Sequence, residues 1–446
     1  MGGITVNNWF ESQFKLKERK TDVHTEVMAG ITTFMTMAYI IFVNPGILEA
    51  TGMPFGALMV STCLAAAFAT LLMAFIANYP IALASGMGLN AFFAFTVVIG
   101  MSVPWEVALA AIFIEGIIFI ILTLTRFREY VVNGIPMSLK YGIAAGIGFF
   151  IALIGFQNGG ITISNPATMV GQASFNNNLP AILTILGLVI IGALEAKRVR
   201  GAILWGILII TAISIPLGVA QMPDRIISAP PSIAPIFMKM DFSWVSFNFS
   251  NPNIMNFWIV VFTFFFVDFF DTIGTLVGVS GRANLLDEKG NLPKAREALL
   301  SDAIGTVGGS VLGVSTVTAY VESASGIGVG GRTGLTSLVT GLLFLVAIFF
   351  NPIVSIVPAC ATAPALIFVG AYMMMSVTKI DFNDWTELLP AVIAIFVMPF
   401  AYSIAAGIVF GVITYAAVKL LTGRVKEVSL IIWVLAVIFI LKELFI

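Results

Sequence analysis

The sequence predicts an all-α polytopic membrane protein with 14 transmembrane segments, arranged as two inverted repeats of seven spans. Of its 446 residues, 59% are hydrophobic and 10% are charged, whereas soluble proteins carry about 25% charged residues. The mean hydropathy is +1.03, and apolar runs long enough to cross a bilayer recur along the chain. Two of these runs, 80–100 and 314–331, are broken at corresponding places in the two halves, as in many transporters.

Composition argues against several other classes of protein. The formal net charge of −1 does not favour nucleic-acid binding. Cys63 and Cys360 both lie in apolar runs, and His24 is the only histidine, so we expect neither a disulfide framework nor a metal site. The polar N-terminal segment, 1–23, is followed by an apolar run long enough to span the membrane, and we therefore expect no cleaved signal peptide.

The apolar runs fall into two sets of seven. Those of the first half cover about 26–48, 56–78, 80–100, 104–125, 137–156, 180–196 and 200–219. A proline-rich polar loop, 220–254, separates them from the second set at 255–279, 297–313, 314–331, 333–356, 360–377, 385–399 and 402–421. A further run, 428–446, fits either an extra span or a helix lying along the membrane surface.

The distribution of basic residues predicts the orientation. With the N-terminus in the cytoplasm, 19 of the 22 lysines and arginines fall on the inner side, while the outer loops hold Arg225 and Lys239 and Lys442 is unassigned. Such a bias is typical of cytoplasmic loops. Because each half has an odd number of spans, the two halves must run in opposite directions.

The two broken runs predict a site at the middle of the membrane. In 311–332, alternating β-branched residues lead to Glu322, which is followed by small residues that could begin a short helix capped by this glutamate. In 79–95, an extended run ends at a glycine-rich break. A shift of 236 residues places Gly86 on Glu322 and Thr70 on Thr306. Two half-helices would then begin near the midplane and direct unpaired N–H groups toward a ligand.

Four carboxylic acids lie well inside apolar runs: Asp268, Asp271, Asp302 and Glu322. An acid at the bilayer centre costs about 2.5–3.5 kcal/mol on insertion scales, so each is a functional candidate. Asp268 and Asp271 share neighbouring parts of one helical face. No lysine or arginine lies in the membrane interior to neutralise these acids permanently, and protonation or a bound cation would lower the cost. For Asp302, and also for Glu115, a purely structural role stays open.

Neutral residues near the first break have two interpretations. Asn90 follows Gly86 and Gly88 and could either cap a half-helix or contact a ligand. Phe92, Phe93 and Phe95 could stack on a flat ring or simply face lipid. The glycine clusters at 305–313 and 326–331 are explained by close helix packing.

Four motifs resemble the AzgA-like purine permeases, a branch of the nucleobase:cation symporter-2 or nucleobase–ascorbate transporter superfamily. The likeness extends from about Phe14 to about Leu421, and the motifs are TTFMTMAYI with VNP at 32–45, ASGMGLNA at 84–91, FVDFFDT at 266–272 and TAYVES at 318–323.

The resemblance implies a core domain formed by 24–125 and 255–356 and a gate domain formed by 137–219 and 360–421. The loop 220–254 would be extracellular. Members import purine bases, such as hypoxanthine, guanine and adenine, through the cell membrane with protons. The core would slide against the gate in an elevator-like motion, and members often pair as homodimers through the gate.

The resemblance also implies roles for individual residues. Asp268 and Glu322 would hydrogen-bond the base, Asn90 would support the site, and Gly86 and Gly88 would form the tight turn. The residues implied for substrate binding are Asp268, Glu322, Asn90, Gly88, Ser323 and Thr318. Those implied for proton coupling are Asp271, Asp268, Glu322 and Asp302.

Other functions stay open at this level. An anion carrier of the same architecture, similar to sulfate permeases, is disfavoured by the intramembrane acids. A membrane-embedded enzyme lacks support, because the sequence contains no HExxH motif and no Cys/His pair. A selective channel and coupling to sodium instead of protons are further alternatives. We expect no cofactor.

Overall fold

The computed structural model describes residues 6–125, 136–165, 169–223, 225–246, 252–282, 285 and 292–445. Several basic residues used to predict the orientation, in 126–135 and 286–291, lie outside these ranges. Parts of the expected loop between the halves, 224 and 247–251, also lie outside them, as does Ile446.

The expected apolar runs of the first half all contain helical structure. They correspond to α2 (Val23–Met37) with α3 (Ile40–Leu48), α4 (Phe55–Leu72), β1 (Leu83–Ser85) with α5 (Met87–Ala91), α6 (Trp105–Leu124), α8 (Met137–Asn158), α9 (Leu179–Ala196) and α10 (Ala202–Ser214). A π-helix, η3 (Phe92–Gly100), continues α5. The first broken run is therefore a strand followed by a half-helix, as predicted.

The second half repeats this order. Its elements are α11 (Pro252–Arg282), α12 (Ala295–Leu312), β4 (Val317–Ala319) with α13 (Ser323–Val329), α14 (Gly334–Ala347) with α15 (Asn351–Val354), α16 (Ala359–Met374), α17 (Trp385–Phe400) and α18 (Ile404–Leu421). The last apolar run forms α19 (Leu430–Phe445). Eight helices in the described ranges are long and apolar enough to cross a membrane. The predicted helical membrane fold is confirmed, while the count of fourteen crossings stays a prediction.

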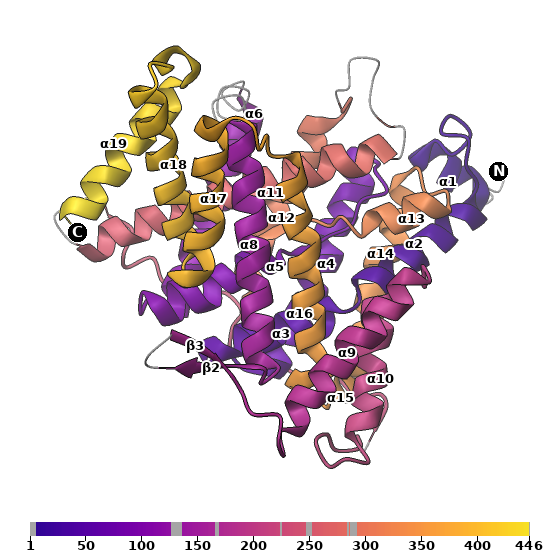
Figure 1. The fold of residues 1–446 in the computed structure, drawn as a ribbon. Coiled ribbons are helices and arrows are strands. Elements are labelled where there is room, and N and C mark those ends of the chain that lie inside the picture. The colour runs from indigo at the N-terminus through magenta and orange to yellow at the C-terminus, as the bar shows by residue number, and fades with distance from the viewer. Residues whose placement is uncertain are drawn as a thin grey trace.

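Two elements were not expected from the sequence. The polar leader contains a helix, α1 (Val6–Phe14), and the connection after α8 forms a hairpin of β2 (Thr162–Asn165) and β3 (Met169–Gln172). The hairpin lies at the end of the molecule where α3 also lies (Figure 1). Both segments are too short and too polar to give the periodic apolar pattern that predicts a span.

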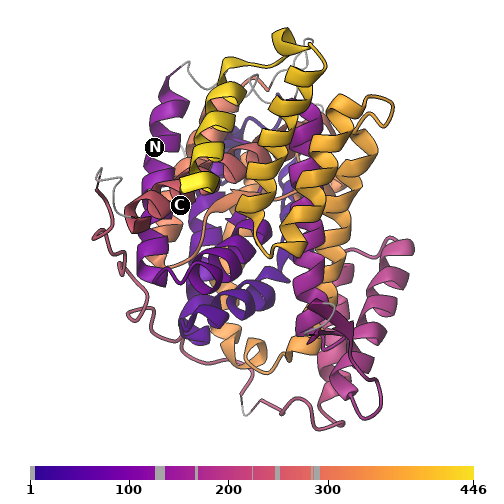
Figure 2. The same cartoon turned by 60° about the vertical axis from the view of Figure 1, so that its left-hand side comes forward.

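The helices pack in two groups. In one group, α6 and α4 pack on α12, α2 and α4 pack on α14, and α11 packs on α6. In the other, α8 packs on α16 and α17, α17 packs on α18, and α9 packs on α10 and α16; Figures 1 and 2 show α8, α16, α17 and α18 side by side. The crossing of α8 and α16 needs glycine, because a Cβ on Gly148 would lie 2.6 Å from the Gly370 carbonyl oxygen.

A buried glutamate fastens the start of α2 to the start of α14. The Glu26 carboxylate accepts hydrogen bonds from the backbone N–H groups of Arg332 (2.8 Å) and Thr336 (3.1 Å) and from the Thr336 hydroxyl (2.6 Å). It thereby satisfies N–H groups that a helix N-terminus leaves without intrahelical partners. Glu26 is fully buried, and its role here is structural.

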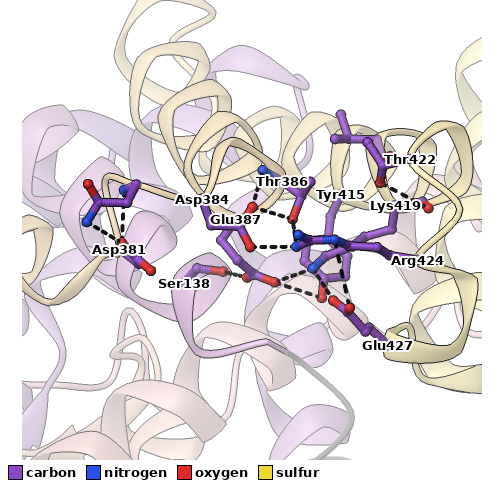
Figure 3. A network of polar contacts seen from close by, with 12 residues as sticks. Ser138, Asp381, Asp384, Thr386, Glu387, Tyr415, Lys419, Thr422, Arg424 and Glu427 are labelled. Carbon is purple, nitrogen blue, oxygen red and sulfur yellow. Dashed lines mark hydrogen bonds and ion pairs between the residues drawn. The ribbon is translucent and has the colours of Figure 1, made fainter.

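A second polar network joins α17, α18 and the segment that leads to α19 (Figure 3). The Lys419 ammonium, 1% exposed, lies 2.7 Å from Glu387 and 2.6 Å from Glu427. The Ser138 hydroxyl of α8 donates to Glu387. Nearby, hydrogen bonds from Thr386 and the Arg424 guanidinium lower the pKa of Asp384, the N-cap of α17, to about 2.

We expect Lys419→Met to destabilise the protein by about 1–3 kcal/mol, because the partly buried Glu387 carboxylate loses its cationic partner. The measurement is thermal unfolding in detergent. Lys426→Met is the matched control, because Lys426 is exposed. Equal unfolding temperatures for the two variants would contradict a stabilising role for the network.

Candidate functional site

The two broken segments meet as a pair of antiparallel strands. Leu83, Ala84 and Ser85 of β1 oppose Ala319, Thr318 and Val317 of β4. Two further backbone bonds extend the pair, from the Gly86 N–H to the Thr316 carbonyl (3.0 Å) and from the Tyr320 N–H to the Ala82 carbonyl (3.0 Å). Each irregular segment therefore satisfies the backbone of the other, as burial in a membrane requires.

A threonine on the preceding helix supports each strand in the same way. The Thr70 hydroxyl donates to the Leu83 carbonyl and accepts from the Leu83 N–H, both at 2.9 Å. The Thr306 hydroxyl makes the same pair of bonds with Val317, at 3.0 and 3.2 Å. The structure thus confirms the correspondence of Thr70 and Thr306 predicted from the sequence shift.

The half-helices begin directly after the β1–β4 pair, which is the strand crossing of the two repeats. Gly86 is the N-cap residue of α5 and Glu322 is that of α13, so the predicted match of these positions is also confirmed. Asn90 lies in the fourth position of α5 rather than at its start. A Cβ at Gly88 would lie 2.6 Å from Ile147 of α8, which places Gly88 at the contact between the two groups of helices.

Asn90 is the centre of a buried polar cluster. Its Oδ1 accepts from the Ser85 hydroxyl at 2.6 Å and from the Ser315 hydroxyl. Its amide donates to the Ser85 carbonyl at 3.4 Å, and the Tyr320 hydroxyl donates to that same carbonyl. Asn90 thus ties α5 to both strands of the crossing, which is a structural role that a ligand contact could accompany.

Glu322 is held by a tyrosine from the first half of the chain. The Tyr39 hydroxyl donates to its carboxylate at 2.7 Å. Tyr39 is 1% exposed and is the N-cap residue of α3, at the break between α2 and α3. The Glu322 side chain makes no capping bond to its own helix. The backbone N–H of Glu322 also interacts with this carboxylate.

The aspartates of α11 point to different neighbours. Asp271, half-buried, interacts with the Thr318 hydroxyl and with the Glu322 carboxylate. The hydroxyl of Ser323, also in the predicted site, accepts the Ala82 N–H at 3.0 Å. Asp271 thus lies within electrostatic reach of Glu322 at the crossing.

Asp268 lies one turn earlier in α11 and is fully buried. The Thr272 hydroxyl lies 3.1 Å from both carboxylate oxygens of Asp302 and 3.4 Å from Asp268 Oδ1. Asp268 also interacts with Asp271 and with Glu115 of α6. The sequence-predicted acids thus form one chain of neighbours that runs from Glu322 through the two α11 aspartates to Asp302.

Sequence reasoning did not single out Tyr39, Ser85 or Ser315 as site residues. A threonine-rich stretch precedes Tyr39, but it gives only a weak indication that the helix breaks there. The apolar cleft between α4, α12 and α14 is separate from the acids and is lined by Leu64, Ala67, Phe68, Leu71, Gly308, Leu312 and Leu345. It has no polar group suited to orienting a ligand.

Chemically, the crossing offers carboxylate acceptors at Glu322 and Asp271 and a hydroxyl at Thr318, next to the beginning of α5. The carboxylates and the hydroxyl can accept hydrogen bonds from N–H groups of a neutral, planar ligand. The backbone N–H groups at the start of α5 can donate to the acceptor atoms of that ligand. In the described residues, no lysine or arginine forms an ion pair with these acids.

Residues 24–410 of this sequence match a protein family described as a permease family. The chain belongs to that family. The resemblance inferred from the motifs is confirmed by relatives in this permease family that align over nearly the whole chain. The adenine permease AdeP of Escherichia coli is 45% identical, with 98% of this chain and 96% of that protein covered. The guanine/hypoxanthine permease PbuG of Bacillus subtilis is 44% identical, with 97% and 99% covered.

The fold of this permease family member is also found in a solved transporter. The transmembrane domain of the cyanobacterial bicarbonate transporter BicA superposes with a TM-score of 0.63 at 17% identity, covering 86% of this chain and 97% of that chain. The likeness establishes the architecture of two inverted repeats. The chain is a multi-pass membrane protein and a transporter, not an enzyme.

We expect Asn90→Ala to lower the free energy of unfolding by about 1–3 kcal/mol, because the buried Ser85 and Ser315 hydroxyls lose their common acceptor. Thermal unfolding in detergent measures this change. Asn158→Ala is the control, since Asn158 is exposed at the end of α8. An unchanged melting temperature for Asn90→Ala would show that the crossing does not depend on this amide.

Proposed function

We propose that this permease imports purine nucleobases by proton symport, with the base bound at the strand crossing. The observation that carries the proposal is the pairing of Glu322, positioned by Tyr39, with Asp271 and Thr318 at the starts of the half-helices. Support also comes from the names of its relatives, which are adenine and guanine/hypoxanthine permeases.

A purine matches this set of groups. Its ring N–H groups donate to carboxylates, and its ring nitrogens accept from N–H groups such as those that open α5. Glu322 and Asp271 are the acceptors we assign to the base, with Asp268, Asn90, Gly88, Ser323 and Thr318 forming or supporting the surrounding wall. Discrimination between adenine and the 6-oxopurines would depend on which donors face the exocyclic group.

We further propose that the two groups of helices act as core and gate. The protein would lie in the cell membrane with its N-terminus in the cytoplasm. Packing between the groups is limited to a few pairs, such as α5 with α8 and α3 with α16. Sliding of the core along the gate would carry the crossing, and the base with it, past the contact of Gly88 and Ile147.

We expect cells that express the chain to accumulate labelled hypoxanthine, guanine or adenine, and we expect a protonophore to abolish the accumulation. Glu322→Gln should lower uptake by about a hundredfold, because the site loses a charged acceptor. Glu49→Gln, at an exposed position, is the control. The proposal fails if none of the purines enters cells whose membranes contain the protein.

We expect Tyr39→Phe to lower kcat/KM for uptake about tenfold, since a hydrogen bond to a charged group contributes about 1.5–3 kcal/mol. Initial rates at several base concentrations provide the measurement. Tyr141→Phe is a matched control, because the Tyr141 ring contacts Lys379 without needing its hydroxyl. Equal kcat/KM for both variants would mean that Tyr39 does not position Glu322 for binding.

An anion carrier is the second candidate, and the fold shared with the bicarbonate transporter favours it. The acids at the crossing oppose it, because carboxylates repel an anionic substrate. Competition of labelled hypoxanthine uptake by bicarbonate or sulfate would separate the two candidates.

A further inference from the structure

Glu115 lies in the middle of α6 and is fully buried. Neither of its carboxylate oxygens has a hydrogen-bond partner among the described residues, and the same is true of Asp268 Oδ2. The two side chains nevertheless interact with each other. Two carboxyl groups can lie together in a buried position when one of them is protonated and donates its hydrogen to the other.

We propose that Glu115 and Asp268 share one proton and that this pair, behind the base site, is where the co-transported proton binds. The inference rests on the proposed proton symport. It assigns a role to Glu115, and it gives Asp268 a role in coupling instead of direct contact with the base.

The donors near the pair are too few for three ionised acids. Among the described residues, Asp268 and Asp302 share one side-chain donor, the Thr272 hydroxyl. A hydroxyl has one hydrogen, so it cannot serve both aspartates at once. A buried carboxylate without donors or a counter-ion is strongly unfavourable, and such a group takes up a proton instead.

The charged surroundings of the pair are all acidic. α6 packs on α11, α12 and η3. Within the apolar part of α11 the titratable groups are Asp268 and Asp271, from α12 the nearest is Asp302, and η3 contains none. At the far side of α11, Glu322 and Tyr320 approach Asp271. In the described part of the chain, no basic side chain forms an ion pair with any of these acids.

Apolar side chains pack closely around Glu115. On α6, a Cβ at Gly116 would lie 2.7 Å from the Val307 side chain of α12. One turn from Glu115, the ring of Phe119 is fully buried and packs edge-on against Phe265 and Phe269 of α11. The exchange of a proton must therefore use the polar groups that connect the pair to the crossing.

Two connections of that kind exist. Thr316, whose buried hydroxyl has no partner within the described residues, interacts with Glu115, and its carbonyl accepts the Gly86 N–H at the start of α5. Asp271 follows Asp268 by one turn of α11 and interacts with Glu322. The pair can thus sense the base site through β4 and through α11.

The proton balance is simple. When the site faces outward, the ionised pair takes up one proton, which forms an O–H bond on one carboxyl and a hydrogen bond to the other. When the site faces inward, that O–H bond breaks and the proton leaves to water with the base. The pair changes from two negative charges to one and back, and no other reactant is needed.

Glu115→Gln tests the assignment, because it keeps the side-chain volume and cannot carry the proton. We expect exchange of labelled for unlabelled base across the membrane to persist, while proton-driven accumulation is lost. At about 100 mV, one proton per base supports about 40-fold accumulation, and the variant should reach about onefold. Glu115→Asp should restore part of the accumulation, and Glu106→Gln on the same helix should behave as wild type.

Infrared spectroscopy supplies a readout that needs no substrate. The purified wild-type protein should show the carbonyl-stretch band of a protonated carboxylic acid near neutral pH, and Glu115→Gln should lack it. Absence of the band in the wild type, or accumulation by Glu115→Gln equal to that of the wild type, would overturn the proposal. A band that disappears on addition of sodium would also overturn it in favour of a bound cation.

These readouts separate two kinds of failure. If no purine is transported by the wild type but the infrared band depends on Glu115, the substrate proposal fails and the shared proton stands. If purines are accumulated equally by wild type and variant, the transport function stands and the proton is carried elsewhere.

Discussion

The pairing of β1 with β4 is the constraint on which the rest of the site depends. Non-helical backbone inside a membrane has no water to satisfy its N–H and C=O groups, so it persists only where other protein groups do so. Here each broken segment serves the other, and Thr70 and Thr306 complete the edges. Neither half of the chain could form its strand alone. The crossing therefore locks the two repeats together and fixes where both half-helices begin.

From that fixed point, α11 connects two sets of acids. Asp268 and Asp271 are one turn apart, yet Asp271 reaches Thr318 and Glu322 at the crossing while Asp268 turns toward Glu115 and shares Thr272 with Asp302. Like charges raise each other's free energy in a medium of low dielectric. Gain or loss of one proton by Asp268 and its neighbours would therefore alter how strongly Asp271 and Glu322 attract an N–H donor.

The sequence predicted those features that leave a periodic or compositional trace. Spans, broken segments and the matches of Thr70 with Thr306 and of Gly86 with Glu322 all followed from hydropathy and spacing. Tyr39 did not, because its importance depends on which helix faces it, and Glu115 could be named only as an acid whose role stayed open. Tyr39 matters through a residue 283 positions away, and no local pattern records such a distance. The β2–β3 hairpin was missed because short polar strands outside the membrane have no strong periodicity.

The likeness to a bicarbonate transporter shows how little the architecture says about the substrate. At 17% identity the two proteins share the fold, while this permease concentrates carboxyl groups where its half-helices meet. The N-termini of half-helices attract any acceptor-rich ligand, anion or neutral ring. Carboxylates placed beside these N-termini oppose the binding of an anion, because they repel it. They favour a ligand whose N–H groups can donate to them. We infer that selectivity in this permease lies in a few side chains at the crossing; in the proposed proton symport, protonation of the acids behind it would link the ligand to the proton gradient.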